Sequence, residues 1–157
     1  MSDSTALFKY TPINAAGGLV LRVIAGVPHV LLILRNHKWD LPKGKQEKGE
    51  GVRKCARREV AEEVGIKKKS ITLRHALGCT LHSYTDKYGS FEKTTYWFLM
   101  ESSASSFTPQ QKEGITKTCW LPIAEATSLV AFDNLKTVIA RAADYLRDTP
   151  PPQASHA

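Results

Sequence analysis

The sequence predicts an α/β fold in which a mixed β-sheet is sandwiched between helices. Strand-like segments occur on both sides of one helical segment, residues 51–64, and an amphipathic helix follows from residue 133 onward. At 157 residues, the chain suits one domain that is large enough to bury a hydrophobic core. We therefore expect a polar lead-in over residues 1–12, one domain over residues 13–148, and a disordered tail over residues 149–157.

Two strands are expected before the helical segment. Residues 14–24 predict the first, in which the Gly17–Gly18 pair indicates either a bulge or a close approach of another backbone. Ala25–Gly26 predicts a turn, and the apolar run HVLLILR at residues 29–35 is typical of a strand that is buried on both faces. Residues 36–45 are expected to form a loop that leads into the helix.

The helical segment has both the periodicity and the ending of an α-helix. It contains no proline, and Gly65 lies where a left-handed C-terminal cap is usual. Aliphatic side chains recur every four residues, at Val52, Ala56, Val60 and Val64.

A long hairpin is expected after the helix. Residues 71–84 and 91–100 predict its two arms, which are joined by a turn at residues 86–89. Residues 102–112 have the composition of a loop, and residues 118–123 predict a short strand.

Two further helical segments are expected at the C-terminal end of the domain. Pro122 opens a brief helical turn that continues to Leu129, and Asp133 is a good N-cap for a second helix. The apolar residues of that second helix have helical spacing: Leu135, Val138, Ile139, Ala142, Tyr145 and Leu146.

The net charge of +7 is concentrated around the first helix. Residues 35–74 contain 13 lysines and arginines against 6 aspartates and glutamates, whereas the rest of the chain contains 9 of each. A nucleic-acid surface would explain this excess, but the segment lacks interleaved aromatic residues and any known binding module. We therefore favour the other explanation, in which the excess positive charge creates an electrostatic field that attracts a small polyanion.

Other features exclude several classes of protein. The three cysteines, Cys55, Cys79 and Cys119, lie far apart without the spacing of a metal site, so we expect reduced thiols. No apolar run approaches the length of a membrane span, and the N-terminal residues lack the apolar core of a secretory signal. We expect a cytoplasmic protein that has no membrane partner.

Three glutamates of the helical segment are expected on one side of the helix. At about 100° per residue, Glu59, Glu62 and Glu63 project roughly a quarter turn from the apolar stripe. Carboxylates so close together repel one another unless a cation lies among them or their protonation changes. Oxygen ligands of this kind suit Mg²⁺ or Mn²⁺. The alternative interpretation is a solvated helix face.

These glutamates belong to a longer motif. Residues 44–66, GKQEKGEGVRKCARREVAEEVGI, follow the spacing G-x5-E-x7-R-E-U-x-E-E-x-G-U, where U is a bulky aliphatic residue. The stretch resembles the Nudix box of the Nudix hydrolases at every defined position. A chance match of this kind arises about once in 10⁸–10⁹ starting positions. The resemblance spans residues 14–147 and implies the α/β/α sandwich of that family.

The resemblance also implies a reaction. Nudix hydrolases break a phosphoanhydride bond in a nucleoside diphosphate linked to another group, using a divalent metal ion. By the matching box positions, Glu59, Glu62 and Glu63 are expected to bind Mg²⁺ or Mn²⁺ together with the carbonyl of Gly44. The ion would neutralise pyrophosphate charge and lower the pKa of a bound water. Arg58 is expected to orient a box carboxylate through a charge-assisted hydrogen bond.

Two residues are candidates for the general base. Glu59 is the first choice, because box helices commonly bring that glutamate to the metal-bound water, and Glu113 in the later loop is the alternative. Glu62 and Arg58 complete the candidate catalytic group. Glu50, at the start of the helix, is expected to act either as a relay to the ligands or as a favourable charge near the helix N-terminus.

Four residues are candidates for substrate binding. Lys43 and Lys45 flank Gly44 and are expected to meet the substrate phosphates, and Arg35 would reach the same cleft from the end of its strand. Tyr84 lies 18 residues after the box, where diadenosine-polyphosphate hydrolases often carry a tyrosine.

The sequence WDLPKGK ahead of the box narrows the substrate class. It resembles dinucleoside-polyphosphate hydrolases, diphosphoinositol-polyphosphate phosphohydrolases and some nucleotide-pool sanitising enzymes. We expect a dinucleoside polyphosphate or a nucleoside triphosphate first, and an inositol pyrophosphate second. A non-catalytic Nudix-like module that binds a nucleotide or RNA is the alternative from another class, although such modules typically lose box glutamates. The expected partner is a small polyphosphate rather than a nucleic acid, and the oligomeric state stays open between monomer and homodimer.

Overall fold

Seven strands and three α-helices make up residues 9–149, the part of the chain that the computed structural model describes. The strands are β1 (Thr11–Ile24), β2 (Val27–Arg35), β3 (Lys38–Asp40), β4 (Lys43–Lys45), β5 (Ile71–Asp86), β6 (Gly89–Ser102) and β7 (Ile115–Pro122). The helices are α1 (Val52–Val64), α2 (Ile123–Leu129) and α3 (Asp133–Asp148). None of these helices has the length and the apolar composition that crossing a membrane requires.

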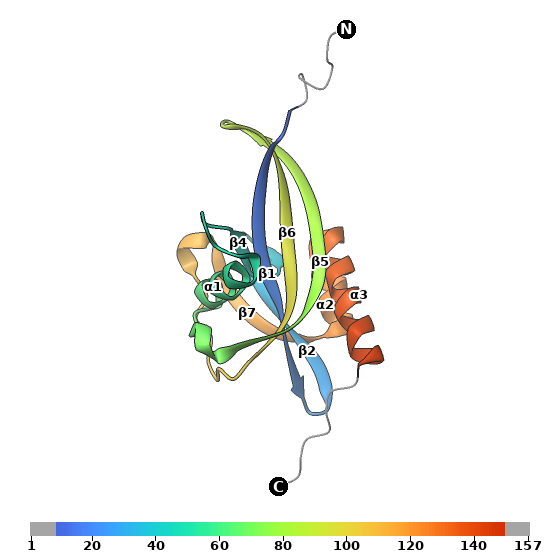
Figure 1. Cartoon of the computed structure of the whole chain (residues 1–157). Coiled ribbons are helices and arrows are strands. Elements are labelled where there is room, and N and C mark those ends of the chain that lie inside the picture. The colour runs from blue at the N-terminus through green and yellow to red at the C-terminus, as the bar shows by residue number, and fades with distance from the viewer. Residues whose placement is uncertain (1–8, 150–157) are drawn as a thin grey trace.

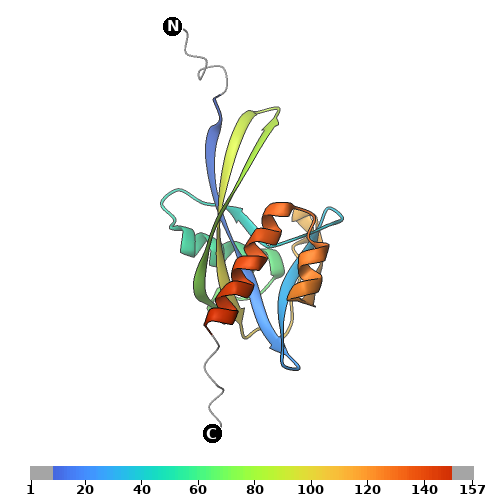
Figure 2. The ribbon, with the colours of Figure 1, turned by 90° about the vertical axis from the view of Figure 1, so that its right-hand side faces the viewer.

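The strands form one mixed sheet with helices on both faces. The sheet runs in the order β3-β2-β1-β6-β5, and β4 pairs with β1 while β7 pairs with β2. The β1–β6 pair is parallel and the other pairs are antiparallel. Figure 1 shows α1 on one side of the sheet and α2 and α3 on the other, and Figure 2 shows α3 lying across its face. This arrangement confirms the predicted α/β fold with a mixed sheet between helices.

Strand β1 is the centre of the sheet because it has partners on both edges. Residues 11–20 pair with β6 on one edge. On the other edge, residues 15–17 pair with β4 and residues 21–24 pair with β2. Two segments from different parts of the chain therefore share one edge of β1. Strand β4 lies beside residues 15–17, and β2 lies beside residues 21–24.

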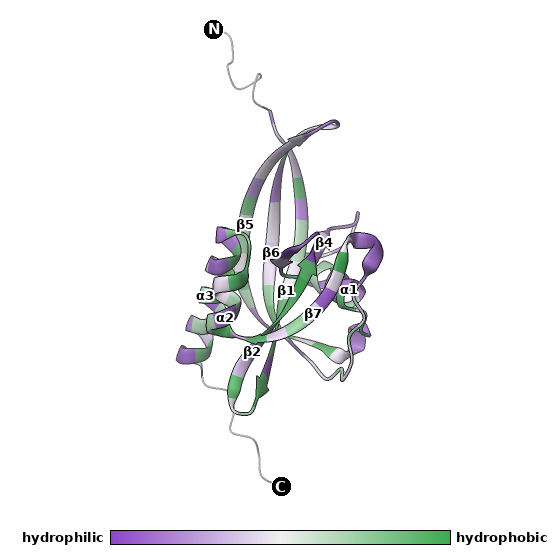
Figure 3. Cartoon of the chain, turned by 180° about the vertical axis from the view of Figure 1, so that it is seen from behind, coloured by the Kyte–Doolittle hydropathy of each residue, from purple (hydrophilic) through white to green (hydrophobic). Residues whose placement is uncertain are grey.

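Alternate side chains of the central strands enter two separate cores. In β1, Leu19 and Leu21 join the core beneath α2 and α3, whereas Ala16 and Val20 join the core beneath α1. Successive side chains of a strand point to opposite faces, so a strand that is covered on both sides is apolar at nearly every position. This explains the run at residues 29–35, and Figure 3 shows mainly hydrophobic colour along the part of β1 between the helices.

The predicted glycine features take defined forms in the structure. The N–H of Gly18 donates to the carbonyl of Pro42 at 3.1 Å, and a Cβ on Gly17 would overlap the same carbonyl, so the pair marks a close backbone approach. Gly65 caps α1 in the left-handed conformation with φ of 69°, as predicted. A Cβ on Gly65 would also overlap Thr108, whose N–H donates to the Val64 carbonyl at 2.8 Å.

The loop prediction for residues 36–45 is wrong, because this segment contains β3 and β4. Asn36 and His37 both have positive φ, 48° and 67°, and so form the tight turn that joins β2 to β3. Strand β4 exists through its pairing with β1, where Gly44 lies opposite Ala16. Three-residue strands have too little periodicity to be recognised from sequence.

The ends of several elements also differ from the prediction. Strand β1 begins at Thr11, inside the predicted lead-in, and β7 begins at Ile115 rather than at Thr118. The remainder of the predicted lead-in and tail, residues 1–8 and 150–157, lies outside the described residues.

Candidate active site

The site begins where β4 lies against α1. A Cβ on Gly44 would overlap the carboxylate of Glu59, so only glycine allows this helix and this strand to approach so closely. The thiol of Cys55 donates to the Gly44 carbonyl at 3.5 Å. Burial raises the pKa of that thiol to about 11, so it is protonated at neutral pH and is not a nucleophile.

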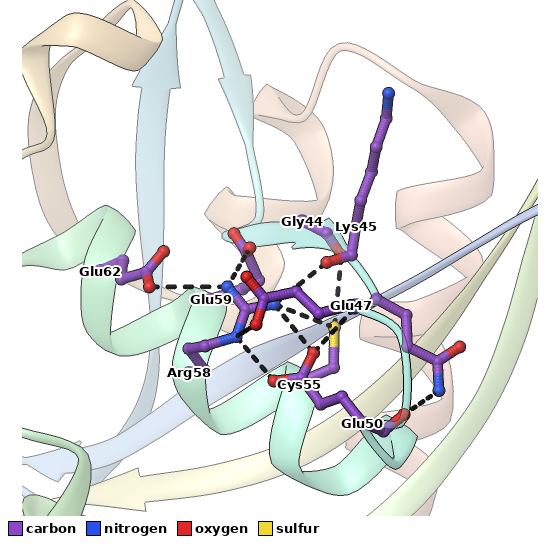
Figure 4. A network of polar contacts seen from close by, with 9 residues as sticks. Gly44, Lys45, Glu47, Glu50, Cys55, Arg58, Glu59 and Glu62 are labelled. Carbon is purple, nitrogen blue, oxygen red and sulfur yellow. Dashed lines mark hydrogen bonds and ion pairs between the residues drawn. The ribbon is translucent and has the colours of Figure 1, made fainter.

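Arg58 connects the acidic residues on this side of α1, as Figure 4 shows. Its Nε and Nη2 donate to the two carboxylate oxygens of Glu50 at 2.6 and 2.9 Å. Its Nη1 donates to Glu59 at 2.8 Å and lies 3.5 Å from Glu62, and its Nη2 also donates to the Lys45 carbonyl at 3.1 Å. Because a guanidinium is planar and carries five donors, one arginine holds several acceptors in fixed positions.

Burial and hydrogen bonding change the acidity of these carboxyl groups in opposite directions. The hydrogen bond from Arg58 lowers the pKa of Glu50 to about 2, so this carboxylate is ionised at neutral pH. Burial raises the pKa of Glu59, although the hydrogen bond from Arg58 opposes this change. Sequence patterns did not predict the Glu50–Arg58 pair, because the two residues are eight positions apart and Glu50 precedes the helix.

Glu63 points away from Arg58 and is buried, with 4% of its surface exposed. One of its oxygens accepts hydrogen bonds from Arg35 Nη2 at 2.6 Å and from the Lys43 N–H at 2.9 Å. Burial raises the pKa of Glu63, and Arg35 opposes the change. Arg35 also lies 3.4 Å from Asp40. This ion pair ties α1 to the end of β2 and to β4.

The chemistry of the donors fits a hard divalent cation. Glu59 and Glu62 both contact the same nitrogen of Arg58, and the backbone of Gly44 borders the Glu59 carboxylate. Two carboxylates and a carbonyl are the oxygen ligands that Mg²⁺ prefers, with water in the remaining positions. Within residues 9–149, no three acidic, histidine or cysteine side chains are already gathered as a metal site, and Glu63 is held by Arg35.

A cavity of about 260 Å³ carries positive charge and is lined by Arg35 and Lys43, the two residues that donate hydrogen bonds to Glu63. Its lining contains three cationic residues, Arg35, Lys43 and Lys93, of which the two lysines form no ion pair within residues 9–149. Burial and the neighbouring cations lower the pKa of Lys93. The rest of the lining consists of Asp40, Thr80, His82, Thr95, Trp97, Phe132, Asn134 and Leu135. Cations that repel one another in this way favour an anionic ligand.

Lys93 is a candidate that sequence patterns did not identify. It lies on β6, where Lys93, Thr95 and Trp97 alternate along one face and all line the cavity. The available signal was the spacing of Lys93, which precedes Thr95 by two residues and Trp97 by four. Residues with this spacing in a strand lie on the same face of the sheet. Its position opposite Arg35 and Lys43 depends on the parallel pairing of β6 with β1.

The side chains of three other predicted residues form no ion pair with the box glutamates within residues 9–149. Tyr84 stacks on Phe91 with ring centroids 5.3 Å apart, and the Nζ of Lys93 lies 5.5 Å from its ring. The Lys45 side chain points away from the Arg58 cluster in Figure 4. Glu113 is exposed in a short 3₁₀ turn.

Sequence comparison adds relatives to this geometry. The family model of the NUDIX domain matches residues 14–145. A Mycobacterium tuberculosis protein named MutT4 is 32% identical over 143 residues, which cover 86% of this chain and 56% of that protein. An 8-oxo-(d)GTP phosphatase of Mycolicibacterium smegmatis is 27% identical over 88% of this chain and 44% of its own length. The chain thus spans about half the length of these two relatives.

A mammalian relative and two solved structures complete the comparison. The asymmetrical bis(5'-nucleosyl)-tetraphosphatase of Mus musculus is 26% identical over 73% of this chain and 76% of its own length. A binary complex of the Caenorhabditis elegans Ap4A hydrolase has a TM-score of 0.73 at 21% identity, covering 87% and 98% of the two chains. The NUDIX domain of Shewanella oneidensis NrtR, bound to ADP ribose, has a TM-score of 0.67 at 20% identity, covering 93% and 99%. At these identities, the two solved structures show a shared fold.

Proposed function

This chain belongs to the Nudix hydrolase family, and we propose on that premise that it hydrolyses a phosphoanhydride bond in a nucleotide with a divalent metal ion. The proposed substrate is a dinucleoside polyphosphate or a nucleoside triphosphate. The observation that carries the proposal is the cation-lined cavity that shares Arg35 and Lys43 with the buried glutamate Glu63.

The cavity has one part for phosphates and one for a base. Arg35, Lys43 and Lys93 provide charge for a chain of phosphates, and Arg35 and Lys43 contact Glu63 directly. A polyphosphate bound there would contact Arg35 and Lys43, which also contact Glu63 of α1. Trp97 and Phe132 give the same cavity aromatic surface, which suits a flat nucleobase.

The metal-binding residues in this proposal are Glu59, Glu62, Glu63 and the carbonyl of Gly44. Nudix hydrolases generally use divalent metal ions. When bound, such an ion supplies charge neutralisation at the phosphates and an acidified water. Glu63 belongs to the set because its partner Arg35 also lines the cavity, so substrate phosphates compete with Glu63 for that guanidinium.

Glu59 is the proposed general base. Its pKa is raised by burial, which brings it closer to neutral pH and makes the carboxylate a better proton acceptor. Arg58 holds one oxygen of Glu59 and so fixes the direction in which the carboxylate points. Glu113 is the weaker choice, because it is exposed and is not among the ion-pair partners of Arg58 within residues 9–149.

The activities named for the relatives support a nucleotide substrate over an inositol pyrophosphate. One relative is a phosphatase of 8-oxo-(d)GTP and another is a tetraphosphatase of bis(5'-nucleosyl) compounds. Both kinds of substrate combine a base with a chain of phosphates. These two parts match the aromatic and the cationic residues that line the cavity.

A product-release screen tests the proposal. The panel contains diadenosine tetraphosphate, GTP, 8-oxo-dGTP, ADP-ribose and a diphosphoinositol polyphosphate, each with Mg²⁺ and with Mn²⁺. We expect metal-dependent turnover of the nucleotides that carry three or more phosphates. Preferred turnover of the inositol compound would reject the substrate class. Tight nucleotide binding without turnover of any compound would identify a non-catalytic module and reject the enzyme.

A further inference from the structure

A second basic hollow borders α1 on a different side from Glu59. It has a volume of about 470 Å³. With about 100° per residue, Arg57 in this hollow lies roughly 160° around the helix axis from Glu59. The residues that line the hollow are Lys48, Gly49, Glu50, Lys54, Arg57, Lys68 and Lys69. A ligand in this hollow would therefore lie on another side of α1 from Glu59, and Glu50, which is paired with Arg58, is the residue that borders both places.

The five cations of the hollow come from three segments of the chain. Lys48 belongs to the loop before α1, Lys54 and Arg57 to α1, and Lys68 and Lys69 to the short 3₁₀ turn that follows. None of the five forms an ion pair within the described part of the chain. Folding thus gathers positive charges that are distant in sequence, and their mutual repulsion opposes this arrangement.

The carboxylate in the lining does not neutralise this charge. Both oxygens of Glu50 accept hydrogen bonds from Arg58, at 2.6 and 2.9 Å. Since Glu50 is already paired, the positive potential of the five cations remains available to an anion from solution.

Arg57 is the one arginine in the lining, and its guanidinium has a nitrogen that is unpaired within residues 9–149. Its Nε is buried and has no hydrogen-bond partner among the described residues. Buried donors in proteins are nearly always paired. The guanidinium of Arg57 lines the hollow and is held by no ion pair within residues 9–149, so its outer nitrogens can form charge-assisted hydrogen bonds to an anionic oxygen there.

The lining also defines the class of ligand. It contains no aromatic residue, so a nucleobase would find no ring on which to stack. The concave shape suits a small molecule better than a flat membrane surface or a long nucleic acid. We propose that this hollow is a second binding site for a small, phosphate-dense polyanion that is recognised by its charge. The anion is either a free condensed phosphate or the phosphate chain of a nucleotide, and the proposal does not rest on hydrolase activity.

A titration of the whole chain with inorganic tripolyphosphate tests this site. Chelator is present to exclude divalent metals, and amide chemical shifts locate the binding. We expect shifts at Lys54, Arg57 and Lys68. The double substitution Lys54→Glu with Lys68→Glu should weaken this binding about ten-fold or more, because two phosphate contacts become repulsive. Both lysines are exposed, so the variant should fold normally.

The matched control is Lys87→Glu with Lys117→Glu, which changes the net charge equally at two other exposed lysines. It should leave the affinity for tripolyphosphate nearly unchanged. An equal loss of affinity in both variants would reject the site, because the effect would then follow net charge alone. Unchanged affinity in the first variant would reject it as well.

Further ligands distinguish the source of the anion. If ATP and tripolyphosphate shift the same amides and adenosine shifts none, the site recognises phosphates alone. Binding of ATP without tripolyphosphate would overturn the proposal in favour of base recognition. Binding of only an RNA duplex or anionic vesicles at these residues would overturn it in favour of a macromolecular surface. The variant Glu62→Gln separates this proposal from the proposed hydrolysis. Tripolyphosphate should bind the hollow of this variant with unchanged affinity, even if the variant hydrolyses no nucleotide.

Discussion

Arg58 is the residue on which the acidic cluster depends, since its guanidinium contacts Glu50, Glu59 and Glu62 at once. A lysine would provide one compact charge and would lose the planar arrangement of donors that holds Glu50 with two nitrogens. Glu50 therefore acts through Arg58, and Arg58 in turn fixes Glu59.

Glu50 should control how stability falls in acid. Its pKa is lowered from 4.5 to about 2, mainly by the hydrogen bond from Arg58, so the unfolded chain binds more protons than the folded protein between these values. The free energy of unfolding therefore rises with pH across this window. The contribution of Glu50 is complete above pH 4.5 and is lost as the pH falls towards 2.

The substitution Glu50→Gln tests this dependence. Urea unfolding across the same pH window should show a shallower loss of stability than in the unchanged protein. Glu125→Gln, at an exposed site on α2, is the control and should keep the original slope. An unchanged slope in Glu50→Gln would contradict the assigned role of the Glu50–Arg58 pair.

Glu62 is the carboxylate at which catalysis and stability are most easily separated. Its side chain is 47% exposed and lies 3.5 Å from Arg58, so Glu62→Gln should disturb the fold little. We expect kcat to fall about 10²–10⁴-fold while the affinity for nucleotide changes little. Steady-state rates at several metal concentrations measure this, with Glu125→Gln as the charge-matched control. Equal turnover in the two variants would remove Glu62 from the site.

At the scale of elements, the site depends on how closely β4 approaches α1. Strand β4 is held by β1, where Gly44 lies opposite Ala16, and α1 packs over the same region of β1. The absence of a side chain at Gly44 leaves room for the Glu59 carboxylate. The loop after β6 reinforces the arrangement, because the Gln110 N–H donates to the Glu63 carbonyl at 3.0 Å.

Gly44→Ala should therefore impair catalysis more than stability. The added methyl would displace Glu59 or move β4 away from α1, and a misplacement of about 1 Å costs on the order of 10²-fold in rate. Gly51→Ala is the matched control, since Gly51 has φ of −73° and no atom near an added Cβ. Comparing kcat and urea midpoints for both variants measures the effect, and normal turnover in Gly44→Ala would contradict the proposed contact.

At the scale of the whole molecule, one sheet serves two cores. Leu99 packs with α2 and α3, whereas its neighbour Met100 packs with α1. Because adjacent residues of the same strand support opposite layers, neither layer is stable without the sheet.

Leu99→Ala tests this dependence. Leu99 is 2% exposed, and removing its side chain should lower the free energy of unfolding by about 2–5 kcal/mol. Leu81→Ala, at a position that is 63% exposed, should change it by less than about 0.5 kcal/mol. Urea unfolding followed by tryptophan fluorescence and by circular dichroism should show one coincident transition in each variant. Separate transitions would mean that the two layers unfold independently.

The box helix could be predicted because its signals are local. The four-residue recurrence of Val52, Ala56, Val60 and Val64 and the cap at Gly65 define α1 within one stretch of chain. The same stretch carries Glu59, Glu62 and Glu63, so helical geometry alone relates them. The hairpin of β5 and β6 and the helix α3 were predicted for the same reason.

The sequence by itself therefore determined the family motif, the main elements and the carboxylates of α1. Only the tertiary structure decided which partner each charge meets. Glu63 pairs with Arg35, 28 residues away, and Lys93 reaches the cavity from β6. Strand β4 likewise exists only beside β1. These features come from sheet pairing between distant segments, and the energy of such contacts depends on three-dimensional proximity, for which a local pattern carries no signal.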